Sequence, residues 1–336
     1  MKLVTFSKEN GMESIGALID DERNIAVLQV GSLLMDDSSS PFFTDMLAFL
    51  QGGSAARDKA QAAVEFITAQ RPPDGIVAVD SVTLLAPVPR PESMRDCLGF
   101  EQHLINFVRA TRLKKIASFD EWVEKTFGRR KSMAGRAIRT FYERPVYYKG
   151  NRFSVIGPDA PMQMPAYTKR LDYELELGIF IGKAGVDIPK RKVRDYIGGY
   201  TLFNDFSARD IQRKEGGGRL GPAKGKDFDT GNAMGPCLVT PDEIPDPYAL
   251  TMTARVNGQE WSRGSSAEMF WSFEDTIEYI SQSETLYPGE FIGSGTCSGA
   301  EGCGCGIEMG KFLQAGDLVE LEAERIGILR NRVVEP

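Results

Sequence analysis

The sequence predicts a mixed α/β fold that is mainly β, in which a small N-terminal α+β domain precedes a larger domain rich in strands. Short strand-like runs separated by polar turns open the chain, at residues 2–7, 14–19 and 24–30. Apolar residues spaced three and four apart then predict helix between residues 41 and 70. From residue 173 onward, strand-like runs dominate. These three observations define the expected fold class.

The boundary between the two domains is expected at residue 85. A strand-like run at residues 82–85 leads into the proline-rich stretch 86–91, which is typical of a stiff connector. We therefore expect a small domain over residues 1–85 and a larger domain over residues 86–336.

The larger domain begins with a helical pattern and continues with strands. Residues 103–147 are rich in Lys and Arg, and we expect them to form a helical lid segment whose basic residues mostly make a solvated face. The strand-like runs that follow lie at residues 173–181, 199–203, 237–240, 250–256 and 318–321.

Composition restricts the kind of partner. The chain has 336 residues, 42% of them hydrophobic, so it can bury a substantial core. Its formal net charge of −7 argues against a nucleic-acid binder, which needs a basic surface. We expect no signal peptide, because the amino terminus carries no apolar run long enough for one, and no apolar run reaches the roughly 18 residues that a membrane span requires. We expect a cytoplasmic protein that binds a small molecule, with no nucleic-acid or membrane partner.

The five cysteines are odd in number and scattered, which suits reduced thiols better than a disulfide framework. Cys303-Gly304-Cys305 could suggest a metal or redox site, but nothing near it in the sequence completes a ligand set. We therefore interpret this Cys-x-Cys segment as a turn.

The most informative residues are carboxylates. Glu174 and Glu176 would project from the same face of an apolar strand, because side chains alternate along a strand. Solvated glutamates on an edge strand are the alternative for such a pair taken alone. Asp205, at the end of another apolar run, and Asp96 add two more oxygen donors. Four carboxylates favour a hard cation such as Mg2+, Ca2+ or Mn2+ over zinc.

Several motifs together resemble the fumarylacetoacetate hydrolase (FAH) family. They are Tyr-Glu-Leu-Glu-Leu-Gly at 173–178, Asn-Asp-Phe-Ser-Ala-Arg-Asp-Ile-Gln at 204–212, Gly-Ser-Gly-Thr at 293–296 and the ending that starts at 316. The resemblance runs from about residue 86 to the carboxyl terminus. It implies an FAH-type mixed β-roll catalytic domain, commonly homodimeric, with one divalent cation, Mg2+ by preference. By the same resemblance the metal ligands would be Asp96, Glu174, Glu176 and Asp205.

The resemblance also implies a catalytic group. The one histidine of the chain, His103, comes seven residues after Asp96, which is the spacing seen in the hydrolase. It would activate water and be oriented by Glu308. The smaller decarboxylase and isomerase members usually carry a glutamate three residues after this histidine, where Asn106 stands here. This difference favours hydrolysis.

The remaining site residues are expected to handle charge on an anionic dicarbonyl substrate. By resemblance, the donors to the developing negative charge are Arg209, Gln212 and Lys226, and the residues that contact the substrate are Tyr148, Thr296 and Arg112, with Arg109 as a substitute for Arg112.

The function predicted from these residues is metal-dependent hydrolysis of a carbon–carbon bond in a 1,3-dicarbonyl, with a role in aromatic catabolism. Leu98 and Gly216 replace two tyrosines of the fumarylacetoacetate enzyme, so an acylpyruvate or other 2,4-dioxo acid is as well favoured as fumarylacetoacetate. The alternatives are a decarboxylase, an isomerase or tautomerase, or a hydratase acting on a 2-oxo acid with the same scaffold. A non-catalytic binding protein is a further alternative, which His103 and Glu308 argue against.

Overall fold

The computed structural model describes residues 1–35, 40–218, 220–300 and 302–336. Its larger sheet has the strand order β4-β3-β2-β1-β14-β12-β11-β17-β6-β7, with β5 paired to β1 and β8 paired to β14. These strands are β1 (Lys2–Ser7), β2 (Glu13–Ile19), β3 (Asn24–Val27), β4 (Ile76–Ala78), β5 (Thr83–Leu85), β6 (Met94–Cys97), β7 (Tyr147–Lys149), β8 (Val155–Ile156), β11 (Leu175–Ile181), β12 (Ile197–Asp205), β14 (Asn232–Val239) and β17 (Phe291–Gly293).

A second sheet has the order β16-β15-β18-β19-β9, and β10 pairs with β13 separately. The hairpin between β15 and β16 turns at Asn257-Gly258, where both residues have positive φ, as a two-residue hairpin turn of this type requires. These strands are β9 (Met162–Gln163), β10 (Leu171–Asp172), β13 (Ser207–Ala208), β15 (Thr251–Val256), β16 (Gln259–Ser265), β18 (Leu318–Ala323) and β19 (Gly327–Val334).

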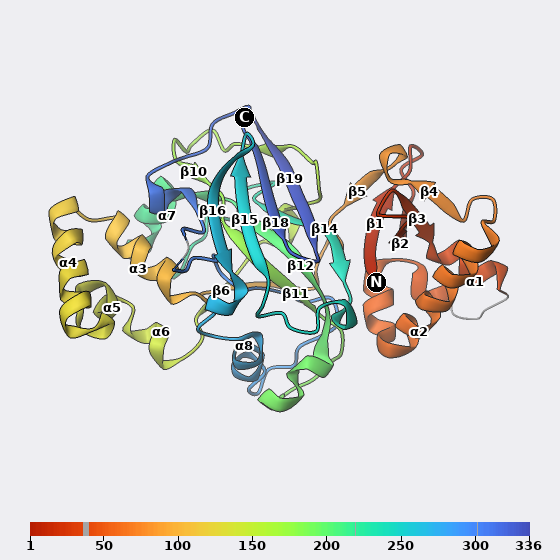
Figure 1. Cartoon of the computed structure of the whole chain (residues 1–336), viewed down its shortest axis with the longest axis horizontal. Helices are drawn as coiled ribbons and strands as arrows, with labels where there is room; N and C mark the ends of the chain where they lie inside the picture. Colours follow the sequence, from red (N-terminus) through yellow and green to blue (C-terminus); the bar gives the residue numbers. More distant parts are fainter. Residues whose placement is uncertain (36–39, 219, 301) are drawn as a thin grey trace.

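Helices lie at the two ends of the molecule and around the sheets (Figure 1). Helices α1 and α2 lie beside β1–β4 at one end, and α3 to α6 extend from the opposite end. The α-helices are α1 (Leu28–Leu34), α2 (Met46–Gln70), α3 (Glu101–Ala110), α4 (Lys114–Phe127), α5 (Met133–Ala137), α6 (Arg139–Glu143), α7 (Arg209–Glu215) and α8 (Phe273–Ile280).

The central strands β11 and β12 determine where the site can form. Every residue of both strands is buried, so neither shows the alternation of a half-exposed strand. Phe291 of β17 packs against Phe180 of β11 and Phe203 of β12, with ring centroids 5.2 and 4.9 Å away. A carboxylate on these strands is therefore buried, and needs a charge partner there.

The mixed, mainly β class predicted from the sequence is confirmed. The strand expected at 24–30 is wrong beyond Val27, because α1 begins at Leu28. Gly31 of α1 packs so closely on α2 that an added Cβ would lie 2.8 Å from Ile67 and 3.1 Å from Ala63, so packing against α2 outweighs the local strand pattern. The helix expected within 41–70 is α2, which Asp45 caps by accepting a hydrogen bond from the Ala48 amide.

The first 85 residues and the rest of the chain are joined by both hydrogen bonds and apolar packing. Strand β1 pairs with β14 through Lys2 and Leu3, so the N-terminal strands continue the central sheet. Leu3 and Phe49 belong to the same buried cluster as Phe203. The domain boundary at residue 85 stays a prediction. The helical pattern of residues 103–147 is confirmed by α3 to α6, and the role of this segment as a lid stays a prediction.

Candidate metal centre and active site

Four buried carboxylates meet where neighbouring strands of the larger sheet lie side by side. Asp96 lies on β6, Glu174 directly precedes β11, Glu176 lies on β11 and Asp205 ends β12. One oxygen of each lies within 4.8 Å of the others. The structure therefore brings together all four residues that the sequence proposed as metal ligands.

Gly293 allows two of these carboxylates to approach. It lies on β17, the strand between β6 and β11. There it pairs with Asp96 of β6 on one side and with Gly178 of β11 on the other. An added Cβ at Gly293 would lie 2.5 Å from Asp96 Oδ1 and 3.1 Å from Glu176 Oε2. The Gly295 amide, two residues on, donates to Glu176 Oε2 at 2.9 Å. The Gly-Ser-Gly-Thr motif thus provides both space and a donor for the cluster.

The carboxylate cluster carries more negative charge than its protein neighbours satisfy. Burial and the Asp205 charge raise the pKa of Asp96 to about 8, and burial raises the pKa of Asp205 to about 6. Burial and Asp96 raise the pKa of Glu176 well above its ordinary value. Asp96 Oδ1, Glu176 Oε1 and Asp205 Oδ1 are buried without a hydrogen-bond partner. Three orphaned oxygens in an all-oxygen donor set fit a divalent cation of the hard class.

Two positively charged side chains border the carboxylate cluster. Lys226 donates to both Glu174 and Asp205, and Arg209 Nη2 donates to Glu174 Oε1 at 2.7 Å. Burial opposes ionisation of Glu174, but Arg209 and Lys226 together hold its pKa below the ordinary value. Glu174 is therefore ionised, while Asp96 and Glu176 favour protonation unless a cation joins them.

Asp172 is a functional neighbour that the sequence reasoning missed. It is fully buried and accepts from Arg209 Nε at 2.8 Å, and from the amides of Gly306 and Ile307 at 2.7 and 3.0 Å. It thereby connects the Arg209 guanidinium to the loop that carries Glu308. Because Asp172 lies two residues before Glu174, alternation along the strand could have suggested that it joins the carboxylates. The same alternation gives no reason to expect its contacts with Gly306 and Ile307.

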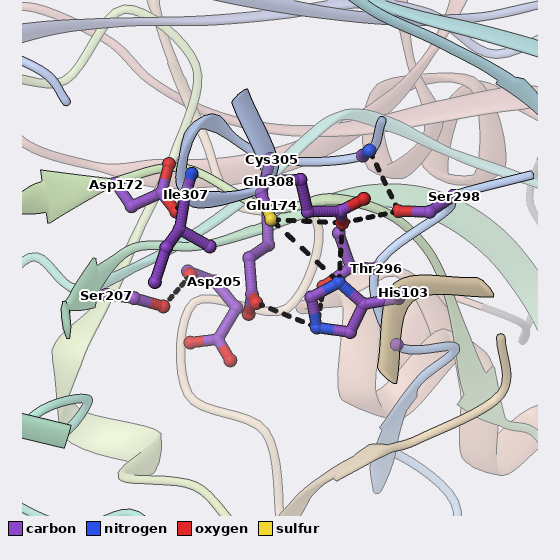
Figure 2. A network of polar contacts seen from close by, with 12 residues as sticks. His103, Asp172, Glu174, Asp205, Ser207, Thr296, Ser298, Cys305, Ile307 and Glu308 are labelled. Atoms are coloured by element: carbon purple, nitrogen blue, oxygen red, sulfur yellow. Dashed lines mark hydrogen bonds and ion pairs between the residues drawn. The ribbon is translucent and has the colours of Figure 1, made fainter. Parts of the chain in front are cut away.

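His103 and Glu308, separated by 205 residues, form a pair beside the cluster (Figure 2). His103 Nδ1 lies 2.7 Å from Glu308 Oε1, and Nε2 lies 3.7 Å from Glu174 Oε1 and 3.4 Å from Thr296 Oγ1. Burial would raise the pKa of Glu308, but its hydrogen bond to His103 and other donors lower it, so Glu308 is ionised. An ionised carboxylate only accepts hydrogen bonds, so Nδ1 carries the hydrogen and Nε2 is the basic atom.

Asn106 and Ser298 complete the surroundings of Glu308, and neither was identified from the sequence as a functional residue. Asn106 Nδ2 donates to Oε2, and Ser298 Oγ donates to Oε1 at 2.6 Å. Asn106 lies one helical turn after His103 on α3, so both side chains reach the same carboxylate. Asn106 entered the sequence reasoning only as a residue that is not glutamate.

A cavity of about 320 Å3 opens beside these groups. Apolar walls are contributed by Leu98, Leu104, Phe107 and Val146. The sequence-proposed residues that line it are Asp96, His103, Tyr148, Glu174, Arg209, Gln212, Lys226 and Thr296. Tyr148 donates to Asp205, and Gln212 accepts from Arg209 at 2.9 Å. Catalytic and substrate-binding candidates therefore share one small cavity.

Arg112, expected to grip a substrate carboxylate, lies outside this cavity. Helix α3 ends at Ala110, and the chain turns away into α4, which leaves Arg112 exposed. Its proposed substitute Arg109 lies between helices and pairs with Asp120 at 3.0 Å and with Glu124 at 2.5 Å. Within the described residues, Arg209 and Lys226 are the cationic side chains that line the cavity.

The fold and the site define an enzyme scaffold whose buried acidic cluster can hold one divalent cation next to a histidine–glutamate pair. Sequence comparison gives the same assignment. Residues 127–334 match the fumarylacetoacetate (FAA) hydrolase C-terminal family. The chain belongs to the fumarylacetoacetate hydrolase family, whose members are enzymes.

Curated relatives align over most of the chain. Oxaloacetate tautomerase Fahd2a, mitochondrial, from Rattus norvegicus is 33% identical over 289 residues, which are 86% of this chain and 79% of that protein. Oxaloacetate tautomerase YisK from Bacillus subtilis (strain 168) is 29% identical over 99% of this chain and 100% of that protein.

Among solved structures, a fumarylacetoacetate hydrolase from the psychrophile Exiguobacterium antarcticum matches with a TM-score of 0.71. It is 23% identical, and the match covers 100% of both chains. It supports the fold.

None of the helices in the described parts of the chain combines the length and apolar character needed to cross a membrane.

Metal-free protein should lose stability as pH rises from about 5 to about 8. The folded-state pKa values of Asp96 and Asp205 lie above the ordinary range, so the folded protein binds more protons there than the unfolded chain. This stability is present at low pH and is lost as pH rises through 6 and 8. Mg2+ should therefore raise the melting temperature more at pH 8 than at pH 5, and at 100 times its Kd it should add about 2.7 kcal/mol to the free energy of unfolding.

Thermal unfolding with EDTA or with Mg2+, at matched ionic strength set by NaCl, measures both effects. A Mg2+ shift that is absent, or is larger at pH 5 than at pH 8, would contradict the metal assignment.

Asp172→Ala should lower the free energy of unfolding by about 3–5 kcal/mol, because it leaves the buried Arg209 guanidinium without one of its two carboxylates. The matched control is Glu143→Ala, which breaks the exposed 3.6 Å pair with Arg139 and should cost no more than about 1 kcal/mol. Urea unfolding of both variants gives the comparison. Equal losses would mean that the Asp172 contact is not a structural constraint.

Proposed function

We propose that this chain is a metal-dependent tautomerase that interconverts the keto and enol forms of a small 2-oxo dicarboxylic acid such as oxaloacetate. The observation that carries the proposal is the position of the His103 base, with Nε2 at 3.7 Å from Glu174 Oε1 of the carboxylate cluster and inside the cavity. The substrate class is taken from the relatives named as oxaloacetate tautomerases, which align over 86% to 99% of this chain.

The predicted cation supports this chemistry. Asp96, Glu174, Glu176 and Asp205 would hold it, and when bound it would act as a Lewis acid that draws negative charge from the reacting oxygen. The protein groups then have to move a proton between carbon and oxygen and to orient the substrate.

His103 can move that proton. Glu308 accepts the Nδ1 hydrogen, so Nε2 is free to take the proton from the carbon beside the carbonyl, and the imidazolium can return it to the oxygen. Thr296 Oγ1, 3.4 Å from Nε2, can donate to the same region. The ionised Glu308 stabilises the imidazolium during the transfer, and Asn106 and Ser298 keep that carboxylate in place.

The size and charge of the cavity favour a small anion. Its volume of about 320 Å3 is at the lower end of ligand pockets, which span about 300–1,000 Å3. Lys226 and Arg209 line it, while Leu98 and Phe107 restrict its apolar side. A four-carbon dicarboxylate suits these dimensions better than a substrate with a bulky acyl chain.

Carbon–carbon bond hydrolysis is the second candidate. The His103–Glu308 pair that moves a proton in tautomerisation could equally take a proton from water, as the family resemblance implies. Asn106 does not separate the two reactions. The carboxylate that other members place three residues after the histidine is supplied here by Glu308, to which Asn106 donates.

His103→Gln should lower kcat for oxaloacetate tautomerisation by about 10²- to 10⁴-fold, because the base is lost while the four carboxylates remain. Thr111→Ala, an exposed change at the end of α3, is the control and should leave kcat within about twofold. The loss of enol absorbance gives the rate, and Mg2+ binding followed separately should be unchanged in both variants. An unaffected rate in His103→Gln would contradict the assignment.

A substrate panel separates the two candidate reactions. Oxaloacetate and a set of 2,4-dioxo acids are incubated with the Mg2+-loaded protein in D2O, and the products are identified by mass. Tautomerisation incorporates deuterium and leaves the carbon skeleton intact. Cleavage of a 2,4-dioxo acid into two fragments, with no acceleration of oxaloacetate tautomerisation, would favour the hydrolase instead.

A further inference from the structure

The Cys-x-Cys segment at residues 303–305 lies against the His103–Glu308 pair. Cys305 Sγ is 3.3 Å from Glu308 Oε1 and 3.9 Å from His103 Nδ1 (Figure 2). Cys303, which is half-buried, lies close enough to Glu308 that burial and this carboxylate together raise the pKa of its thiol to about 11. The fold therefore supplies the nitrogen and oxygen ligands that the sequence did not place near these thiols.

We propose that His103, Glu308 and Cys305 form a second metal site that binds a borderline or soft ion such as Zn2+ and thereby blocks the His103 base. The blocking effect rests on the proposed tautomerase function, whereas the metal binding does not.

The spacing of the ligand atoms supports the site. His103 Nδ1, Glu308 Oε1 and Cys305 Sγ form a triangle with edges of 2.7, 3.3 and 3.9 Å. A tetrahedral zinc with bonds of about 2.0–2.3 Å separates its ligand atoms by about 3.3–3.6 Å. The 3.3 Å edge falls within that range, the 3.9 Å edge is about 0.3 Å above it and the 2.7 Å edge about 0.6 Å below it, differences that rotations of the side chains can supply.

The ligand chemistry separates this site from the carboxylate cluster. Asp96, Glu174, Glu176 and Asp205 offer oxygen alone, which suits Mg2+ or Mn2+. The second site offers a thiol sulfur and an imidazole nitrogen, which favour Zn2+ and its neighbours in the transition series. The two sets share no residue, so both metals can bind at once.

Metal binding at Nδ1 would change the protonation of the base. The Cys305 thiol loses one proton to solvent as its sulfur–metal bond forms, because the thiolate is the ligand. The Nδ1 hydrogen moves to Nε2, because Nδ1 needs its lone pair for the metal. Nε2 then carries a hydrogen where it faces the substrate cavity, and it can no longer accept a proton there. The imidazole stays neutral, so the carboxylate cluster feels no new charge from the ring.

Cobalt absorption provides the test, because a sulfur-to-cobalt charge-transfer band appears only when a thiolate is bound. The full-length protein, with Mg2+ in excess to fill the carboxylate cluster, is titrated with Co2+. We expect a band that saturates at one Co2+ per chain. Cys305→Ser should abolish it. Cys237→Ser, a buried control on β14 whose Sγ contacts the Ile326 carbonyl, should leave it unchanged.

The absence of a charge-transfer band in the wild-type protein, or a band that persists in a folded Cys305→Ser variant, would overturn the proposed site. If Cys305→Ser does not fold, as judged by circular dichroism, the His103→Gln variant decides: a band that saturates at the same Co2+ concentration as in the wild-type protein overturns the site. In the tautomerase assay, Zn2+ should inhibit the Mg2+-loaded protein, and Cys305→Ser should need at least tenfold more Zn2+. A band without any tautomerase activity would support the site and reject the proposed function.

Discussion

The mutual repulsion of four buried carboxylates is the constraint on which the rest of this structure depends. Burial and the neighbouring charges push the pKa of Asp96 and Glu176 upward, while Lys226 and Arg209 hold Glu174 ionised. Such a cluster is costly in a strand environment that is otherwise apolar on both faces. A divalent cation would relieve the repulsion and satisfy the three orphaned oxygens. The polar neighbours of the cluster can be understood as supports for that arrangement.

Two sets of buried contacts extend from the carboxylate cluster. Arg209 links Glu174 to Asp172, whose carboxylate also accepts the Gly306 and Ile307 amides and so fixes the loop that carries Glu308. On the other side, His103 lies between that loop and Glu174. The position of the base relative to the cluster is thus set by a buried network rather than by one helix alone. The same network brings the Cys305 thiol to 3.9 Å from His103 Nδ1.

Much of this could be predicted from the sequence where local patterns carry the information. The Glu174–Glu176 alternation and the motifs around Asp205 and Gly293 led to residues that the structure places together. Asp172 and Ser298 were missed because their roles depend on contacts between segments more than a hundred residues apart or on a loop with no regular pattern. Arg112 was proposed from the family resemblance, but α3 ends before it and the next helix turns away from the cavity. Asn106 was interpreted only as a position without glutamate, whereas in the structure it donates a hydrogen bond to the Glu308 carboxylate.

The fold alone does not choose among the reactions of this family, since one scaffold can support several chemistries. The cluster and the base are common to the competing mechanisms, so the account depends first on the cation. Anomalous diffraction from crystals soaked in Mn2+ tests this most directly. The account predicts one strong peak within about 2.0–2.6 Å of oxygens from Asp96, Glu174, Glu176 and Asp205. Saturating Mn2+ with no peak inside the cluster would contradict it.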